Sequence, residues 1–344
     1  MKTLEIPREG RAPSQILIGA GAVAELARLV PAGRRLFVVT DPHLAEAYAE
    51  LLAPYHKIII GLGEEHKTLS TVEQIHTELI AAGADRSSYL VGFGGGIVTD
   101  ITGFVASTYM RGVGFGFVAT SLLAQVDASV GGKNGVNLGG YKNMVGVFNQ
   151  PDFVLCDVAL LDTLPRREFV AGLAEVVKSA VIGDAELFEI LERTAVDELL
   201  ANKELLSEVV ARTVSVKARI VEADEREGGV RRLLNLGHTV AHAIEKCSRR
   251  WVHGEAVAIG MNYIGRAAQR AEVSDAQTTE RIVALLSRLG LPTECEIPMS
   301  ELTVALRKDK KGSAGCIHVV FPCAIGRCEV RTMTYSELDS LLLG

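Results

Sequence analysis

The sequence predicts an α/β fold: an N-terminal domain with a mostly parallel, Rossmann-like sheet, followed by a mostly α-helical C-terminal domain. Two patterns lead to this prediction. In the first half, short β-branched runs of strand length alternate with helical stretches, which is the β-α-β rhythm of a parallel sheet. After residue 165, apolar residues recur at three-to-four spacing over long stretches. We therefore place the domains at residues 1–165 and 166–344, with the boundary near Pro165.

Three apolar runs in the N-terminal domain predict buried strands, at Arg35–Thr40, Lys57–Ile60 and Ser88–Phe93. Near-continuous apolarity, rather than alternation, is typical of strands that are covered on both faces of a parallel sheet. Between the second and third runs, Ser70-Thr-Val-Glu is a capping-box pattern, so we expect a helix to begin there and to run toward Ala82.

Helical periodicity dominates the C-terminal domain. The predicted helices cover Glu168–Ile182, Leu199–Val221, Leu234–Cys247 and Glu255–Ala271. One hairpin is expected late in the chain, from Ile317–Phe321 and Cys328–Thr332, because a turn containing Pro and Gly joins two runs of strand type.

Composition places the chain among soluble globular enzymes. Its 344 residues are 48% hydrophobic and 23% charged, and the net charge of −6 gives no reason to expect nucleic acid or a membrane surface as a partner. We see no secretory signal and no apolar run of membrane-spanning length, so we expect a cytoplasmic protein. The six cysteines show no paired spacing and are expected to be reduced thiols that bind no metal.

Three histidines lie close together in the sequence of the C-terminal domain. His238 and His242 are one helical turn apart and so share a helix face, and His253 follows shortly after. Upstream, Glu175 and Lys178 share another helix face. Imidazole and carboxylate ligands that leave one coordination position open are typical of a catalytic zinc. The i, i+4 pair could supply two ligands, or His242 could stay free as an acid–base group, and spacing does not decide between them.

Glycines follow the predicted strand that ends at Phe93. Gly94-Gly-Gly could let the backbone approach a phosphate at the start of the next helix, although a plain strand-to-helix turn uses the same residues. Asp41, at the end of an earlier strand, could bind a ribose, cap the helix that follows it, or do both.

A second glycine-rich stretch carries polar side chains that suit an anionic, polyhydroxylated ligand. They are Asp127, Lys133, Asn137, Lys142 and Asn143, preceded by Arg111. Lys and Arg bind carboxylate or phosphate, whereas Asp and Asn bind hydroxyl groups. The C-terminal domain adds Lys217, Glu227 and Arg231, and a lysine run at Lys308–Lys311 that is more typical of a solvated surface.

Several long motifs resemble those of one enzyme family. They are Gly94–Gly146, Ala171-Gly-Leu-Ala-Glu-Val-Val-Lys, Asn235-Leu-Gly-His-Thr-Val-Ala-His-Ala and His253-Gly-Glu-Ala-Val. In this order and at this length, they are similar to the motifs of 3-dehydroquinate synthases. The resemblance implies an NAD-binding N-terminal domain and a metal-binding C-terminal domain. It also implies a divalent metal (zinc, with cobalt as an alternative), an anionic sugar-phosphate substrate and a homodimer.

The resemblance further implies a reaction, the second step of the shikimate pathway. 3-Deoxy-arabino-heptulosonate 7-phosphate is converted to 3-dehydroquinate and inorganic phosphate. NAD oxidises the C5 alcohol, phosphate leaves by elimination, the carbonyl is reduced again, the ring opens and an intramolecular aldol closes the carbocycle. NAD is regenerated in each turnover.

Carried over position by position, the resemblance assigns roles to individual residues. The implied metal ligands are Glu175, His238 and His253, and the implied catalytic groups are His242, Glu227 and Lys133. The implied NAD-binding residues are Asp41, Gly63, Glu64, Glu65, His66, Lys67, Gly94, Gly95, Gly96, Ile97, Val98, Thr99, Asp100, Thr120, Ser121, Lys133 and Lys142. The implied substrate-binding residues are Arg111, Asp127, Lys133, Asn143, Lys178, Lys217, Arg231, Asn235 and Lys310.

The chain departs from the family pattern at Thr99, Ser121 and Asn134, where Gly, Thr and Thr are common. A side chain at Thr99 would lie close to the NAD phosphate, which puts the cofactor geometry there in question. Two other activities stay open: a cyclase acting on sedoheptulose 7-phosphate or an amino analogue, and a metal-dependent alcohol dehydrogenase of the glycerol-dehydrogenase type. Arg231 and Asn235 argue against sedoheptulose 7-phosphate, which has no carboxylate for them to bind.

Overall fold

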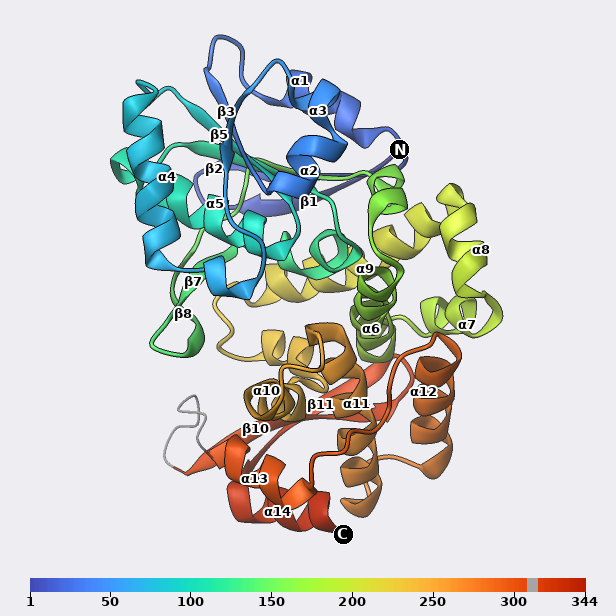
Figure 1. The fold of residues 1–344 in the computed structure, drawn as a ribbon. Coiled ribbons are helices and arrows are strands. Elements are labelled where there is room, and N and C mark those ends of the chain that lie inside the picture. Colours follow the sequence, from blue (N-terminus) through green and yellow to red (C-terminus); the bar gives the residue numbers. More distant parts are fainter. Residues whose placement is uncertain (308–314) are drawn as a thin grey trace. The chain divides into compact units, whose positions relative to one another are not determined.

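The computed structural model describes residues 1–307 and 315–344, and the chain forms two compact units (Figure 1). The first unit comprises Met1–Pro165 and Asn202–Val214, and the second comprises Arg166–Ala201 and Ser215–Gly344. The return of the segment Asn202–Val214 to the first unit was not expected from the sequence. Lys310, one of the implied substrate contacts, lies outside the described residues.

The first unit is built on a seven-stranded sheet in the order β1-β2-β9-β6-β5-β3-β4. From β2 to β4 each neighbouring pair is parallel, whereas β1 runs antiparallel to β2. This arrangement confirms the predicted, mostly parallel sheet. The strands are β1 (Lys2–Arg8), β2 (Arg11–Ile18), β3 (Leu36–Thr40), β4 (His56–Ile59), β5 (Tyr89–Gly94), β6 (Gly114–Ala119) and β9 (Phe153–Cys156).

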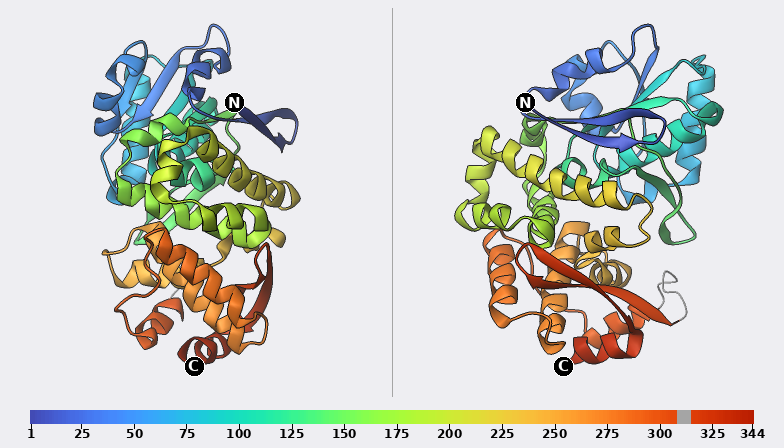
Figure 2. Two further views of the ribbon diagram at one scale, coloured as in Figure 1. Left: turned by 90° about the vertical axis from the view of Figure 1, so that its right-hand side faces the viewer. Right: turned by 180° about the vertical axis from the view of Figure 1, so that it is seen from behind.

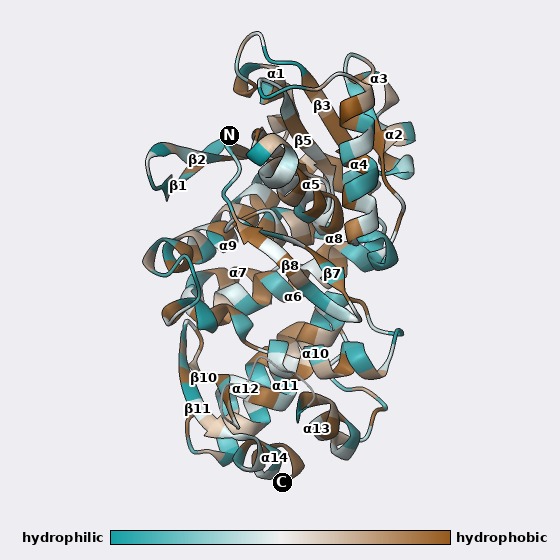
Figure 3. Ribbon diagram, turned by 90° about the vertical axis from the view of Figure 1, so that its left-hand side faces the viewer, coloured by the Kyte–Doolittle hydropathy of each residue, from teal (hydrophilic) through white to brown (hydrophobic). Residues whose placement is uncertain are grey.

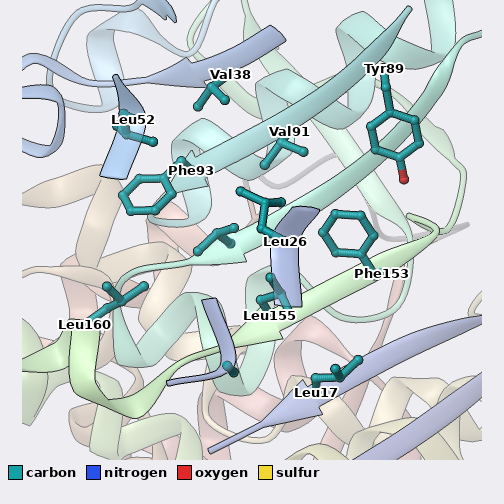
Figure 4. Close-up of a cluster of buried hydrophobic side chains, with 12 residues drawn as sticks. Leu17, Leu26, Val38, Leu52, Tyr89, Val91, Phe93, Phe153, Leu155 and Leu160 are labelled. Atoms are coloured by element: carbon teal, nitrogen blue, oxygen red, sulfur yellow. The ribbon is translucent and has the colours of Figure 1, made fainter. Parts of the chain in front are cut away.

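Helices cover both faces of this sheet. They are α1 (Leu26–Leu29), α2 (Pro42–Ala47), α3 (Ala49–Leu52), α4 (Leu69–Ala81) and α5 (Gly96–Thr108). One face packs against α1, α2 and α3, and Figure 4 shows Val91 and Leu155 of this face beside Leu26 of α1. The other face packs against α5. Figure 3 shows β3 and α5 coloured as hydrophobic over much of their length, as expected for elements that are buried on formation of the core.

Two local features of the first unit differ from the sequence-based expectation. The capping box predicted at Ser70 is wrong, because Thr68 is the N-cap of α4 and its Oγ1 accepts a hydrogen bond from the Thr71 amide at 3.3 Å. Thr68 has the extended backbone that an N-cap requires, whereas Ser70 lies inside the first turn. The second glycine-rich stretch forms an antiparallel hairpin of β7 (Lys133–Leu138) and β8 (Tyr141–Phe148).

The second unit is mostly helical, as predicted. Its helices are α6 (Arg166–Gly183), α7 (Ala185–Arg193), α8 (Val196–Ala201), α10 (His238–Cys247), α11 (His253–Arg270), α12 (Ala276–Arg288), α13 (Met299–Arg307) and α14 (Tyr335–Leu343). The predicted helix over Leu199–Val221 is divided at Asn202, where α8 ends and α9 (Lys203–Ala223) begins. Helix α9 contributes residues to both units.

The late hairpin is also confirmed, as β10 (Cys316–Ala324) paired with β11 (Arg327–Thr334). It packs on the helices of its own unit, with β10 against α11 and β11 against α6. The right-hand view of Figure 2 shows the hairpin in red. None of the described helices combines the length and the apolarity needed to cross a membrane.

Candidate functional site

Two glycines allow three helices of the second unit to approach closely enough to share a site. A Cβ on Gly254, the residue after His253, would lie 1.9 Å from the Ala171 carbonyl oxygen of α6. A Cβ on Gly237, the residue before His238, would lie 2.8 Å from the Val257 carbonyl oxygen of α11. Such distances exclude any side chain, so α6, α10 and α11 meet backbone to backbone beside the two histidines.

This packing brings together Glu175 from α6, His238 from the start of α10 and His253 from the start of α11. The Glu175 Oε1 atom lies 3.6 Å from the Nε2 atom of each histidine. One ligand atom from each of the three residues falls within 4.8 Å of the others. The carboxylate is fully buried, and its second oxygen forms an ion pair with Lys178.

The donor set fits a divalent metal ion. Ligand atoms about 2.1 Å from a tetrahedral zinc ion are about 3.4 Å apart, close to the spacing observed between Glu175 and each histidine. Two imidazoles and one carboxylate leave a fourth position for a substrate atom. A cobalt ion accepts the same ligand types.

Each histidine directs its Nε2 atom toward Glu175 because its Nδ1 atom has another partner. The Nδ1 atom of His238 lies 3.1 Å from the Leu236 carbonyl oxygen, and that of His253 lies 3.3 Å from Glu245 Oε1. Partners of this kind select the tautomer whose Nε2 lone pair is available to a metal. Sequence reasoning missed Glu245, although its position seven residues after His238, two turns along α10, was a usable signal.

The two histidines differ in protonation. Burial, together with the positive charge of Lys178, lowers the pKa of His238 to about 3, so this imidazole is neutral at physiological pH. Burial also acts to lower the pKa of His253, but the carboxylates of Glu175 and Glu245 outweigh it and raise this pKa to about 9. In the absence of a metal, His253 therefore carries a proton that metal binding must displace.

His242 lies beside this cluster but outside it. Its ring centroid is 5.6 Å from that of His238, and the rings meet edge to face. Among the described residues, the set whose ligand atoms converge contains His238 and not His242. Of the two alternatives left open by the i, i+4 spacing, this geometry favours the one in which His238 alone of the pair is a ligand.

Buried cations occupy the same unit. Lys178, Lys217 and Arg231 are each at most 7% exposed, which is unusual for charged side chains. Burying a cation is costly unless anionic groups neutralise it, so such a group of residues suits an anionic ligand. Asn235 donates a hydrogen bond from Nδ2 to Glu227 Oε1 at 2.7 Å, which links two further implied site residues.

In the first unit, the sheet order reverses between β3 and β5. β4 lies on one side of β3, whereas β5, β6 and β9 continue on the other. Open α/β sheets bind dinucleotides outside the carboxyl ends of the strands at such a reversal. Asp41 follows the carboxyl end of β3, Gly94 ends β5, and Gly95 is the N-cap of α5, which begins at Gly96. The Asp41 carboxylate also caps α2, by accepting a hydrogen bond from the Leu44 amide at 3.0 Å.

Two further implied NAD residues, Thr120 and Thr99, adjoin the glycine turn. The Thr120 amide donates to the Gly94 carbonyl at 3.0 Å, so the segment after β6 adjoins the glycine turn. Thr99 is fully buried, and its hydroxyl donates to the Gly96 carbonyl at 3.1 Å. The Thr99 side chain is thus turned into the protein. Asn134, another departure from the family pattern, is buried and donates to the Gly132 and Asn149 carbonyls.

A hydrogen-bonded network joins the loop before α4 to the β7–β8 hairpin. Lys67 Nζ contacts Asp100 Oδ2 at 2.5 Å and Asn143 Oδ1 at 2.6 Å. Asn137 donates from Nδ2 to Glu64 Oε1 at 2.8 Å, and its Oδ1 accepts from the Asn143 amide at 2.9 Å. Residues implied to bind NAD and one implied to bind substrate are therefore held together. Asn137 was not among the implied site residues.

The other implied residues of the first unit lie in several of its local elements. Gly63 adopts φ +93° ahead of the short turn Glu64–His66, which includes Glu65. Asp127 lies in the π-helical turn Ala124–Ala128, Lys133 begins β7 and Lys142 is exposed on β8. Ile97 and Val98 lie in the first turn of α5, and Ser121 follows Thr120.

Arg111 is separated from these residues. It follows the carboxyl end of α5, at the sheet edge where β6 begins. Helix α5 has 13 residues and so spans about 20 Å. Within the first unit, Arg111 and the glycine turn at Gly94–Gly96 therefore lie at opposite ends of this helix.

Comparison with known proteins places the chain in a family. Residues 57–171 match the model of the 3-dehydroquinate synthase N-terminal region, and residues 172–312 match that of the C-terminal region. A 3-dehydroquinate synthase from Pelobacter propionicus is 43% identical over 340 residues, covering 95% of each chain.

Two solved structures are also similar. A 2-deoxy-scyllo-inosose synthase in complex with carbaglucose-6-phosphate, NAD+ and Co2+ shares the fold, with a TM-score of 0.89 at 24% identity over 100% of both chains. A 2-epi-5-epi-valiolone synthase from Streptomyces hygroscopicus with NAD+ and Zn2+ bound has a TM-score of 0.87 at 27% identity over 98% of both chains. The sequence matches extend over nearly the whole chain. The chain therefore belongs to the 3-dehydroquinate synthase family.

Proposed function

We propose that this chain converts 3-deoxy-arabino-heptulosonate 7-phosphate to 3-dehydroquinate and inorganic phosphate, with NAD and a divalent metal, most simply zinc. The observation that carries the proposal is the convergence of Glu175, His238 and His253 in a unit that also buries Lys178 and Arg231. A metal set with buried cations suits a substrate that carries a carboxylate and a phosphate. Family membership and the NAD-bound structures of two similar cyclases support the same assignment.

In this proposal the second unit binds the metal and most of the substrate. Glu175, His238 and His253 would hold the metal, which would supply a Lewis acid for a hydroxyl of the substrate. Lys178, Lys217, Arg231 and Asn235 bind its anionic groups and hydroxyls, together with a lysine of the run Lys308–Lys311. When bound, the metal lowers the pKa of a coordinated alcohol and NAD accepts hydride from the carbon that bears it.

The first unit binds NAD at the reversal point of its sheet. The amides at the start of α5 would bind the pyrophosphate, and Asp41 would accept hydrogen bonds from a ribose. The Lys67–Asp100–Asn143 network supports this proposal because it ties the cofactor loop to the hairpin that carries Lys133 and Lys142. Asp127, Lys133 and Asn143 are the substrate contacts that we propose in this unit, whereas Arg111 lies at the far end of α5.

Proton transfer falls to groups beside the metal rather than to the ligands. His242 is the first, because it adjoins His238 without joining the converging set. Glu227 is the second, because its carboxylate is held by Asn235. Both groups take or return protons at substrate hydroxyls, while the buried cations keep the substrate in one orientation.

We also infer that two copies assemble and that the protein works in the cytoplasm. Strands β7 and β8 form a two-stranded sheet of their own. This hairpin exposes the apolar side chains of Leu138, Tyr141, Met144 and Phe148, which a second copy would cover. The six cysteines, all of which are among the described residues, form no disulfide, in keeping with a reducing compartment. Light scattering should give a mass of two chains, and the variant M144K should shift it toward one chain.

The test of function uses the purified protein with NAD and zinc. With 3-deoxy-arabino-heptulosonate 7-phosphate we expect stoichiometric phosphate release and no accumulation of NADH, and we expect a chelator to stop the reaction until zinc is restored. Steady NADH accumulation from an alcohol substrate would support a dehydrogenase instead. Turnover of sedoheptulose 7-phosphate alone would overturn the proposed substrate.

A further inference from the structure

The carboxylate of Asp224 organises the turn between α9 and the segment that leads to His238. It follows the last residue of α9, Ala223. Its Oδ1 atom accepts the Gly228 amide at 2.9 Å, and its Oδ2 atom accepts the amides of Gly229 at 2.7 Å and Arg231 at 3.0 Å. Three backbone donors thus converge on one side chain, and the chain from 224 to 231 closes around it.

The turn closed by Asp224 carries two implied site residues. Glu227 adopts φ +61°, a left-handed conformation that is unfavourable for a residue with a side chain. Its carboxylate accepts a hydrogen bond from Asn235 at 2.7 Å. Arg231, which is 2% exposed, donates from its guanidinium to the Glu225 carbonyl of the same turn.

We propose that Asp224 is a positioning residue, which holds the turn in the one conformation that presents Glu227 and Arg231 to the substrate. The inference rests on the proposed function, which gives these two residues their roles. Asp224 acts through the backbone, because the amides that it binds belong to Gly228 and Gly229, which follow Glu227, and to Arg231 itself.

The chemistry of the carboxylate explains why this position needs Asp. An ionised carboxylate accepts at both oxygens, and its hydrogen bonds with amides are charge-assisted. These backbone hydrogen bonds, from Arg231 first and then Gly229, lower the pKa of Asp224, so the carboxylate is ionised at neutral pH. An Asn amide would turn a donor toward at least one of the three N–H groups, and Ala would leave all three to water. The left-handed conformation of Glu227 would then lose its support.

The first experiment compares D224A and D224N with a matched control, D275A. Asp275 also accepts a backbone amide, that of Thr278 at 2.7 Å, but it caps α12. We expect kcat/KM of D224A to fall by more than about tenfold, as for other losses of positioning. Zinc content should stay at the wild-type level and D224N should lie between D224A and wild type. D275A should keep wild-type kcat/KM. Equal kcat/KM for D224A and D275A would overturn the inference.

A second comparison separates positioning from a general loss of stability. In an E227Q background, D224A should lower kcat/KM by clearly less than it does in the wild type, because only the positioning of Arg231 is then left to lose. Fully multiplicative effects would contradict the inference. If E227Q alone is fully active, the proposed role of Glu227 fails; if E227Q is impaired while D224A is normal, only the inference fails.

Hydrogen exchange provides a readout that needs no substrate. The amides of Gly228, Gly229 and Arg231 should be protected in the wild type and in D275A, and should exchange faster in D224A. Unchanged protection in D224A would overturn the inference whatever reaction the protein catalyses.

Discussion

The Nδ1 atom of His253 lies 3.3 Å from Glu245 Oε1, while its Nε2 atom lies 3.6 Å from Glu175 Oε1. The imidazole thus stands between two carboxylates, one on the metal side and one behind it. The side chain of Glu245 is 9% exposed, so little solvent weakens this contact. An imidazole held in this way keeps its tautomer and becomes a stronger ligand.

Removing the rear carboxylate should therefore weaken metal binding. For E245A we expect the zinc dissociation constant to rise about 10- to 100-fold, the usual effect of losing such a partner. E245Q keeps an acceptor oxygen and should show a smaller rise. The measurement is competition with a chelating dye at a pH of about 9.5, where protons no longer compete for His253.

A matched control for this prediction is E296Q, which removes an exposed carboxylate paired with Arg250 in the same unit. It should bind zinc like the wild type. Equal zinc affinity of E245A and E296Q would show that Glu245 does not support the ligand.

Metal affinity should depend on pH through His253. Its pKa is about 9 in the metal-free protein, so below that pH the metal must displace a proton. Because one proton leaves His253 for each zinc ion bound, zinc affinity should rise by about tenfold per pH unit from pH 7 toward 9 and should level off above pH 9. His238, with a pKa of about 3, adds no dependence in this range. Competition titrations across this range test the slope, and a flat profile would contradict the assignment of His253 as a protonated ligand.

His238 and His242 should respond differently to the same substitution. H238A should lose both zinc and turnover, because it removes a member of the converging set. H242A should retain zinc but lose about 10²- to 10⁴-fold in kcat, the usual contribution of an acid–base group. Zinc content by elemental analysis, beside kcat, separates the two. Loss of zinc from H242A would mean that both members of the pair are ligands.

The close approach of α11 to α6 should be intolerant of a methyl group. G254A places a Cβ against the Ala171 carbonyl oxygen, and overpacking of this kind typically costs about 1–3 kcal/mol. We expect a lower midpoint in urea unfolding and reduced zinc content, since His253 is the adjacent residue. The control is G183A, at the end of α6, where the added Cβ would lie at an ordinary contact distance of 3.4 Å from Val216 Cγ1. A zinc-replete G254A with wild-type stability would show that this approach does not position the ligand.

Sequence patterns captured most of the fold because each depends on local physics. The apolar runs at β3, β4 and β5 lie within a residue of their predicted bounds, since strands that are buried on both faces must be apolar throughout. The start of α4 was misplaced because Ser70 and Thr68 both have N-cap chemistry, and only the backbone conformation distinguishes them.

Residue types, spacing and motif order were enough to indicate a His and carboxylate metal set, an anion-binding group and the enzyme family, because local sequence specifies helices and their polar faces. Contacts between distant segments settled the rest. These contacts include His238, but not His242, in the converging ligand set, and they place Glu245 next to His253 Nδ1. Arg111 lies at the far end of α5 from the glycine turn. The reason is physical: which face of a helix meets its neighbour depends on backbone approach, here at Gly237 and Gly254, and no spacing rule within one segment contains that information.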